Sequence, residues 1–496
     1  MDSIIFMFGS YELAGLSLFV TVGSFMLILF DKKRRSPEKS YYNHFINLIL
    51  TPARAMGLGP YKKELTLDNA FKYATRKTGL TDFGEMGFAE AYRFVLDTPT
   101  QKKQQYTNLG FVSARIELNM TFVRRLKMIE YLKQVPRVMS VKVPGPVFVM
   151  GLPRTGTTLL HRLLSLDPQV RAPLLWELLA PVPHKSCKGT EGTFDEVTAS
   201  FEKDKNFRAN FIKKLMKTRK SMGDKAVEHI HEVEWDLPEE CFMTLSDEIP
   251  CLVQYFYSAY MHEKDTEPLL RKQMVEAYSH HKKYLQLLSY QANEGGLAPD
   301  SSDGGNDWAT KDPRRWMLKC PIHLYYPEEI AKVFPDAKLI WTHRHPISAV
   351  PSFCSLIQSL HKLYYENECR DDHELGKIML KVSEYMLQSA PGRIDKSHLP
   401  CADVIYNNLV ADPLKAVKEI YLQFGWHFSS EYEARLTEYL RQDKLHRDAL
   451  KAKRMKEGSG SLHSYTPEEF GLTAEQLSTG GYADYVRRYN IPLSKN

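Results

Sequence analysis

The chain has 496 residues, of which 43% are hydrophobic and 25% are charged. These fractions are ordinary for a globular protein, and they exclude a disordered chain, a collagen-like repeat and a polytopic membrane protein. The 66 basic and 60 acidic side chains give a formal net charge of +6, an excess too small for this length to indicate a nucleic-acid partner.

An uncharged, apolar run at residues 13–30 is followed at once by the basic cluster at residues 32–35. As a helix rising about 1.5 Å per residue, this run spans roughly 27 Å, close to the hydrocarbon thickness of a bilayer. We therefore predict a short tail at residues 1–12 and a single transmembrane helix at residues 13–30. A buried core helix and a cleaved signal peptide are the alternatives. Because Lys and Arg favour the cytosolic flank, the cluster predicts a cytosolic body.

Residues 31–140 are predicted to form a helical extension, since apolar residues recur every three or four positions between residues 102 and 135. The pattern then changes. A continuous apolar run at residues 147–150 is typical of a buried parallel strand. Residues 338–342 and 404–406 predict two more strands of the same kind.

Helical patterns separate these strands, at residues 157–166, 195–222, 267–291 and 414–424. Strands that alternate with helices favour a parallel sheet with helical cover. We therefore expect residues 141–496 to form an α/β domain, in which a P-loop-like parallel sheet is sandwiched by helices. The helical extension is expected to pack against this domain.

The sequence GLPRTGTT at residues 151–158 connects the first predicted strand to the first predicted helix. Such a turn presents backbone N–H groups and the positive end of a helix dipole to an anion. The spacing imitates a nucleotide-triphosphate P-loop, but Thr157 stands where that motif has its lysine, and the cation, Arg154, lies inside the loop. No Asp follows the strand at residues 338–342 to hold Mg²⁺. This pattern predicts a metal-free site for a phosphate ester; an ordinary strand–turn–helix connection is the alternative.

This loop resembles the 5′-phosphosulfate loop of the sulfotransferases that use 3′-phosphoadenosine 5′-phosphosulfate (PAPS). The form with Arg is typical of the bacterial-type and tyrosylprotein-type branch. A second family motif is Arg344 at a strand end with Ser352 eight residues later, a pair that in the family clamps the 3′-phosphate. A strand-end Arg offers a bidentate fork, and a Ser in the next helix can reach the same anion.

The resemblance covers most of residues 60–490 and implies further contacts with PAPS. Residues 406–414 resemble the segment whose Tyr contacts adenine, and residues 458–460 resemble the C-terminal loop that caps a phosphate. Leu159 stands where the cytosolic small-molecule enzymes have an adenine-stacking Trp, so adenine is expected to be held differently. The implied cofactor-binding residues are Arg154, Thr155, Gly156, Thr157, Thr158, Arg344, Ser352, Tyr406, Gly458 and Ser459.

Sulfuryl transfer requires a general base for the acceptor hydroxyl and a cation for the charge on the leaving oxygen. The resemblance implies Lys319 as the cation. Three residues compete for the role of base. Glu177 is the leading candidate because the tyrosylprotein-type enzymes have their base in this region; His323 lies near the position of the base in the cytosolic enzymes. Glu240 stands at a Pro-initiated helix start, where a carboxylate can also serve only as a cap.

These patterns together predict an enzyme: a membrane-anchored, PAPS-dependent sulfotransferase that acts on a hydroxyl of a carbohydrate, lipid or peptidyl acceptor. A non-enzymatic nucleotide-binding scaffold and a P-loop kinase are the alternatives. A kinase would require the missing lysine and an Asp at a strand end. As a single-pass protein the chain is expected in the endoplasmic reticulum or the Golgi. Family members that act on secreted glycans face the Golgi lumen, whereas the flanking charges here favour a cytosolic body.

Overall fold

The computed structural model describes residues 41–97, 106–183, 194–221, 234–250, 263–292, 314–366, 371–457 and 466–493. The predicted anchor at residues 13–30 and the predicted phosphate-capping residues Gly458 and Ser459 lie outside these ranges. Among the described residues, no helix combines the length and the apolar character that crossing a membrane requires.

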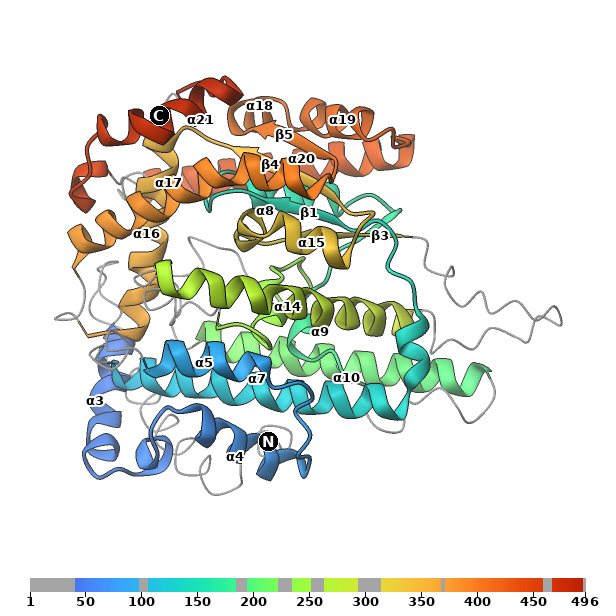
Figure 1. Ribbon diagram of the computed structural model, residues 1–496, viewed down its shortest axis with the longest axis vertical. Coiled ribbons are helices and arrows are strands. Elements are labelled where there is room, and N and C mark those ends of the chain that lie inside the picture. The colour runs from blue at the N-terminus through green and yellow to red at the C-terminus, as the bar shows by residue number, and fades with distance from the viewer. Residues whose placement is uncertain are drawn as a thin grey trace.

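Five strands form a parallel sheet in the order β2-β3-β1-β4-β5 (Figure 1). They are β1 (Val147–Met150), β2 (Val170–Arg171), β3 (Arg315–Lys319), β4 (Lys338–His343) and β5 (Cys401–Ile405). The strands predicted at residues 147–150 and 338–342 are confirmed as β1 and β4. The third predicted strand, at residues 404–406, is the end of β5, but its last residue was wrong, because β5 stops at Ile405 and Tyr406 begins a helix. β2 is only two residues long, too short to show a periodic pattern.

The extension consists of α3 (Tyr41–Ala55), α4 (Leu67–Thr78), α5 (Gly87–Asp97) and α7 (Asn108–Gln134), with the 3-10 turns η2 (Gly59–Lys62) and η3 (Pro136–Ser140). The remaining helices are α8 (Thr157–Leu164), α9 (Leu175–Leu179), α10 (Phe194–Ser221), α12 (Phe242–Leu245), α14 (Glu263–Ala292), α15 (Pro327–Val333), α16 (Pro346–Tyr364), α17 (Asp372–Ser397), α18 (Tyr406–Ala411), α19 (Pro413–Gln423), α20 (Ser430–Glu457) and α21 (Gly480–Tyr489). In the described ranges, the 3-10 turns η6 (Pro321–Tyr325), η8 (Pro467–Phe470) and η9 (Gln476–Ser478) accompany them. The four helices predicted between the strands are confirmed as α8, α10, α14 and α19.

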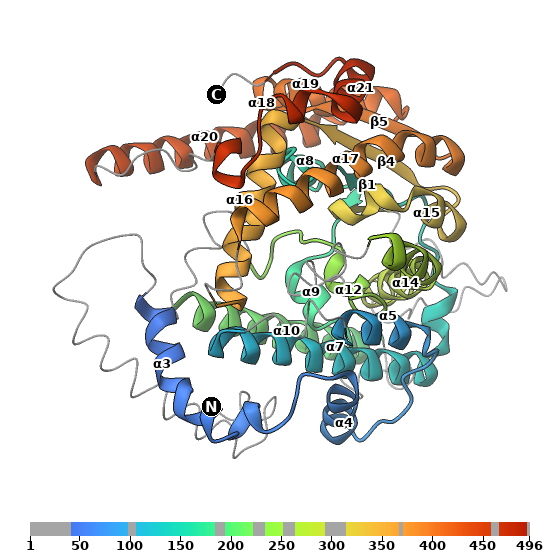
Figure 2. The same cartoon turned by 60° about the vertical axis from the view of Figure 1, so that its left-hand side comes forward.

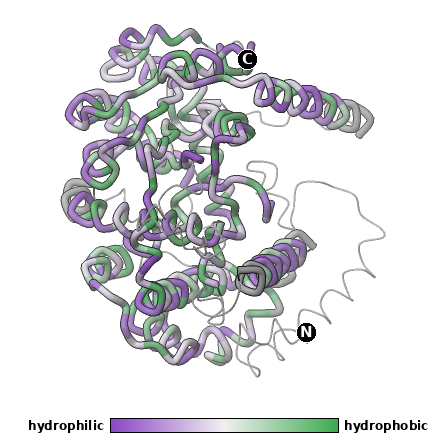
Figure 3. The backbone as a smooth tube through the Cα atoms, turned by 90° about the vertical axis from the view of Figure 1, so that its right-hand side faces the viewer, coloured by the Kyte–Doolittle hydropathy of each residue, from purple (hydrophilic) through white to green (hydrophobic). Residues whose placement is uncertain are grey.

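The sheet is buried on both faces because successive side chains of a strand point to opposite sides. In β1, Phe148 and Met150 join the hydrophobic cluster formed with α14, α15, α16 and α17. Val147 and Val149 join a second cluster, formed with α8, α19 and α20. Along the outer helices hydrophilic and hydrophobic residues alternate, as in helices that cover a core with one face (Figure 3).

The extension forms its own small core and lies at the end of the molecule opposite α19 and α21, with α14 between it and the sheet (Figures 1 and 2). One of its contacts with the α/β domain lies at the start of α7. The N–H of Thr107, the N-cap of α7, donates to the carbonyl oxygen of Tyr364 at the end of α16, at 2.9 Å. This contact ties the extension to the helix that carries Ser352.

We predict that Gly110→Ala destabilises this junction. A Cβ at Gly110 would lie 2.1 Å from the carbonyl oxygen of Tyr364, and a backbone atom cannot yield easily, so the free energy of unfolding should fall by about 1–3 kcal/mol. Gly392→Ala is the matched control, since a Cβ there, in α17, meets no atom within 4 Å. That change should raise stability by about 0.5–1 kcal/mol. Urea unfolding of both variants measures the difference, and equal shifts would contradict the close contact.

Candidate active site

The strand order places a switch point at the carboxyl end of β1, because β3 and β4 lie on opposite sides of it. Open α/β sheets bind their ligands at such a point. The register sets Val149 beside Lys319 and Met150 beside Trp341. The loop after β1, the lysine that ends β3 and the arginine that follows β4 are therefore brought to the same edge of the sheet.

The loop after β1 closes tightly on β4. Gly151 and Gly156 have φ angles of 149° and 90°, and Arg154 has a φ of 70°, which a side chain rarely tolerates. A Cβ on Gly151 would lie 2.5 Å from the hydroxyl oxygen of Thr342 and 2.7 Å from its carbonyl oxygen, so glycine is required there. Gly156 then caps α8, which begins at the buried Thr157 and directs its free backbone N–H groups to the loop.

The hydroxyl of Thr155 is engaged within the loop itself. It donates to the carbonyl oxygen of Leu152 at 2.6 Å, and it lies 2.6 Å from the hydroxyl of Thr342. Its side chain is buried, so Thr155 offers an anion its backbone N–H and not its hydroxyl. Thr158 differs, because its hydroxyl lies 3.5 Å from the ammonium of Lys319.

Two arginines and a serine from separate elements meet beside this loop. The Nε of Arg154 donates to the hydroxyl of Ser352 on α16 at 3.2 Å. Arg344 donates through Nη1 to the carbonyl oxygen of Arg154 at 2.9 Å, and its guanidinium lies 4.4 Å from the ring centre of Tyr406. The Nε of Arg344 is buried and has no hydrogen-bond partner among the described residues. A buried donor without a partner favours a ligand that accepts its hydrogen bond.

Lys319 contacts both the loop after β1, through Thr158, and a carboxylate, that of Glu240. Its side chain is fully buried at the end of β3, and its Nζ lies 2.5 Å from the Oε1 of Glu240. The carboxylate of Glu240 is 18% exposed, and its Oε2 contacts only the thiol of Cys320, at 4.0 Å, among the described residues. The N–H of Cys241 donates to the carbonyl oxygen of Lys319 at 3.0 Å, which holds the acidic segment against β3. A cation and a carboxylate, of which one oxygen is engaged by Lys319 and the other only by a weakly donating thiol, are thus fixed beside the loop.

Glu177 lies elsewhere and is fully engaged. Its Oε1 accepts from Arg171 at 2.9 Å, and its Oε2 accepts from the N–H of Leu174 at 3.0 Å, where it caps α9. Arg171 pairs with Trp316, three residues before Lys319 on β3 and therefore roughly 10 Å from it along the strand. In the described part of the chain, no contact joins Glu177 to Lys319.

His323 is fully buried in η6. Its Nδ1 lies 2.8 Å from the hydroxyl of Tyr278, and its ring packs edge-on against Phe148. Burial, and to a lesser degree the neighbouring His281 and Lys319, hold the pKa of His323 well below its ordinary value. The imidazole is therefore neutral and belongs to the core beneath the sheet.

Two residues that contribute to this site are not among the sequence predictions. Thr342 packs against Gly151 and Thr155, and it is the next-to-last residue of β4. His161 lies on α8 four residues after Thr157, and its Nε2 lies 3.0 Å from the carbonyl oxygen of Met317. Burial, aided by Lys319, lowers the pKa of His161 to about 3. The spacing of four places His161 on the same helix face as Thr157, and this signal could have identified it.

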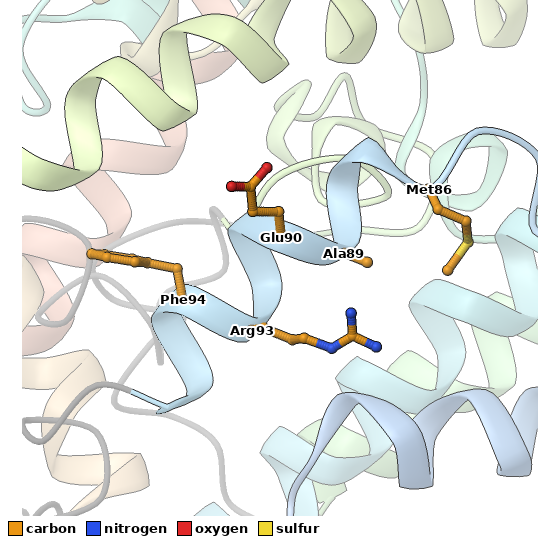
Figure 4. A pocket seen from close by; sticks show the side chains of 5 residues that line it. All are labelled: Met86, Ala89, Glu90, Arg93 and Phe94. Carbon is orange, nitrogen blue, oxygen red and sulfur yellow. The ribbon is translucent and has the colours of Figure 1, made fainter.

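Outside this site, a surface hollow of about 510 Å³ lies beside α5 on the extension. The described residues that line it are Met86, Ala89, Glu90, Arg93 and Phe94. Their side chains diverge and do not converge on one point (Figure 4), so they do not form a built site. In the described ranges, no group of three or more His, Cys, Asp or Glu side chains is arranged to hold a metal.

Comparisons with known proteins agree on one family. The profile of the sulfotransferase family matches residues 146–430. A protein of Mycobacterium tuberculosis (strain CDC 1551 / Oshkosh) named omega-hydroxy-beta-dihydromenaquinone-9 sulfotransferase Stf3 is 23% identical over 307 residues, which cover 61% of this chain and 68% of that protein. A protein of the same name from Mycobacterium bovis (strain ATCC BAA-935 / AF2122/97) matches equally well.

Two solved structures share the fold. Sulfotransferase STF9 from Mycobacterium avium superposes with a TM-score of 0.64 at 24% identity, covering 88% of this chain and 99% of its own. Sulfotransferase STF1 from Mycobacterium tuberculosis H37Rv superposes with a TM-score of 0.60 at 25% identity, covering 83% of this chain and 97% of its own. Both coverages extend well beyond the range of the family profile.

Proposed function

Because the chain belongs to the sulfotransferase family, we propose that it transfers the sulfuryl group of PAPS to a hydroxyl group, with Glu240 as general base and Lys319 as the cation at the leaving oxygen. One observation carries this proposal. The Nζ of Lys319 lies 2.5 Å from the Oε1 of Glu240 and 3.5 Å from the hydroxyl of Thr158. A carboxylate, a cation and the end of the phosphate loop, in the first turn of α8, therefore form one chain of contacts.

The residues at the switch point fit PAPS. Its 5′-phosphosulfate would be held by the backbone N–H groups of the loop at residues 151–156 and by the start of α8 at Thr157. Its 3′-phosphate would be held by Arg344 and Ser352, and the buried, unpartnered Nε of Arg344 supports this assignment. The ring of Tyr406, already stacked with Arg344, would contact adenine.

PAPS, when bound, supplies the sulfuryl group, and its bond from sulfur to the bridging phosphate oxygen is the one that breaks. Glu240 takes the proton from the acceptor hydroxyl as the oxygen of that hydroxyl forms its bond to sulfur. Lys319 stabilises the charge on the phosphate oxygen, which leaves with the electron pair. Arg154, in the loop that would hold the phosphosulfate, adds a second positive charge beside the leaving oxygen. These groups are fixed in the folded protein before the acceptor arrives, so little reorganisation is required.

Glu240 is preferred to the other two candidate bases on grounds of access. Both oxygens of Glu177 are used by an ion pair and a helix cap. His323 is fully buried, and its pKa is depressed by that burial. Glu240 keeps one carboxylate oxygen for an acceptor and lies next to Lys319.

Among carbohydrate, lipid and peptidyl acceptors, we favour a lipid alcohol. The relative Stf3 is named for a hydroxylated dihydromenaquinone, and an anchor at residues 13–30 would keep the site close to membrane lipids. The chain is then a single-pass protein of the endoplasmic reticulum or Golgi. The basic cluster at residues 32–35 favours a body on the cytosolic side.

Arg344→Ala tests the donor. Thermal unfolding of the native chain should be shifted upward more by adenosine 3′,5′-bisphosphate than by adenosine 5′-monophosphate. The variant should lose this difference, since it lacks charge-assisted hydrogen bonds of about 1.5–3 kcal/mol. Arg488→Ala, at an exposed ion pair on α21, is the control and should retain the difference. Equal stabilisation of the native chain by ATP and by the bisphosphate would contradict the proposal and favour the kinase.

Glu240→Gln tests the base. The amide oxygen still accepts from Lys319 but cannot take a proton, so turnover should fall by a factor on the order of 10²–10⁴. Affinity for adenosine 3′,5′-bisphosphate should not change. A membrane extract is first separated into lipid, glycan and peptide fractions, and the fraction that the native chain labels with ³⁵S from labelled PAPS is identified. Turnover is then measured as the transfer of ³⁵S to that fraction. Normal turnover in this variant, with the loss found in Glu177→Gln or His323→Gln, would assign the base elsewhere.

The anchor is tested on the full chain in microsomes. The native chain should remain in the membrane pellet at alkaline pH, and a C-terminal tag should be digested by protease added to sealed vesicles. Val20→Arg combined with Val22→Arg should release the chain, because each charge costs about 2.5–3.5 kcal/mol at the centre of a spanning helix. A native chain found in the soluble fraction would refute the anchor, and a protected tag would refute the cytosolic body.

A further inference from the structure

The segment that carries Glu240 continues directly into α12 and the turn at residues 246–249, and the extension contacts this stretch (Figure 2). Arg124 of α7 donates through Nη2 to the carbonyl oxygen of Met243 at 2.8 Å and to the hydroxyl of Ser246 at 3.3 Å. Arg124 lies before residues 146–430, the range that matches the family. A residue of the extension therefore reaches the segment that carries the proposed base.

Arg124 also forms a buried ion pair with Asp247. Its Nε lies 3.1 Å from Oδ1, and its Nη2 contacts the same oxygen. The side chain of Asp247 is fully buried and that of Arg124 is 9% exposed. Tyr284 of α14 donates its hydroxyl proton to the Oδ2 of Asp247 at 2.5 Å. Next to this pair, Arg125 forms a second buried ion pair, with Glu248.

Stability alone does not account for this arrangement. Burial acts to raise the pKa of Asp247, but the charge of Arg124, the charge of His280 and the hydrogen bonds from both residues together outweigh it and lower the pKa, so the carboxylate is ionised. Removing two charges from water costs about as much as their attraction returns, and apolar replacements of such pairs are often equally stable. An ion pair of this kind instead contributes geometric specificity, since a guanidinium that contacts a carboxylate through two N–H groups fixes the orientation of that carboxylate.

The segment is held at two other points close to Glu240. The N–H of Glu239 donates to the carbonyl oxygen of Pro173 at 3.0 Å, and the N–H of Cys241 donates to that of Lys319 at 3.0 Å. These bonds fix the backbone on each side of Glu240, and the Arg124–Asp247 pair fixes the far end of α12. We propose that Arg124 is a positioning residue, which acts through Asp247 to hold Glu240 beside Lys319. This inference rests on the proposed function, with Glu240 as the base.

The test replaces the pair as a unit, with Arg124→Met combined with Asp247→Leu, in the full chain. Turnover should fall about 10- to 100-fold, because small misplacements of a reacting group have effects of this size. Affinity for adenosine 3′,5′-bisphosphate should stay the same, because the cofactor residues lie on other elements. In a Glu240→Gln background, the same double change should cause no further loss, since both act on one function.

A milder variant covers the case in which the double variant does not fold. Tyr284→Phe removes only the hydroxyl that donates to Asp247, and it should lower turnover several-fold in the native background and not in Glu240→Gln. The matched control is Arg93→Met combined with Asp68→Asn, an exposed ion pair between α5 and α4 of the same extension, which should leave turnover unchanged.

The outcomes separate this proposal from the one on which it rests. Normal turnover in Glu240→Gln alone would remove the base and with it the role of Arg124. A Glu240→Gln variant that is impaired, and that loses as much again when the pair is replaced, would keep the base and overturn the positioning role. Unchanged turnover in the pair variant, or a matching loss of bisphosphate affinity, would also overturn it.

Discussion

The structure depends on the charge of one lysine that is fully removed from water at the end of a central strand. A buried ammonium is costly unless a carboxylate or several acceptors compensate it. Lys319 obtains this compensation from Glu240, which is 79 residues away in sequence. The segment at residues 234–250 must therefore return to the sheet edge and stay there. The contacts of this segment with β3, with Pro173 and with the extension all serve that requirement.

The other half of the site depends on close approach of backbones. β1 and β4 are neighbours, and the loop that follows β1 crosses so near Thr342 that Gly151 cannot carry a side chain. This crossing brings the carbonyl oxygen of Arg154 to Arg344, and the guanidinium of Arg154 to Ser352. Two positive charges are held together in this way beside the start of a helix, an arrangement that favours a ligand with more than one phosphate.

The helical extension stabilises the site from outside the range that matches the family. Two of its contacts with the α/β domain involve elements of the proposed site: the end of α16, which carries Ser352, and the α12 segment, which follows the proposed base. The extension is therefore more than a spacer between the basic cluster at residues 32–35 and the sheet.

The sequence was most informative where the residues of a structural element or motif are contiguous in the chain. The strand, loop and helix at residues 147–164 are contiguous, so periodicity and glycine spacing predicted them together, and the motif that contains Arg344 and Ser352 was found for the same reason. The strand β2 was missed because two residues carry no period. Thr155 was predicted to bind the cofactor, but the local sequence did not indicate through which group; the approach of β4 engages its hydroxyl within the loop.

By itself, the sequence determined the family and the parallel sheet with its covering helices, and it predicted which residues bind a phosphate group, because each of these depends on patterns that are local in the chain. Which of three candidate residues lies beside Lys319 was decided only by the tertiary structure. The sequence ranked Glu177 ahead of His323 and Glu240. In the structure, both oxygens of Glu177 are used by Arg171 and by the cap of α9, His323 is buried in the core, and Glu240 contacts Lys319. Those differences depend on contacts between residues far apart in the chain, and no local pattern contains them.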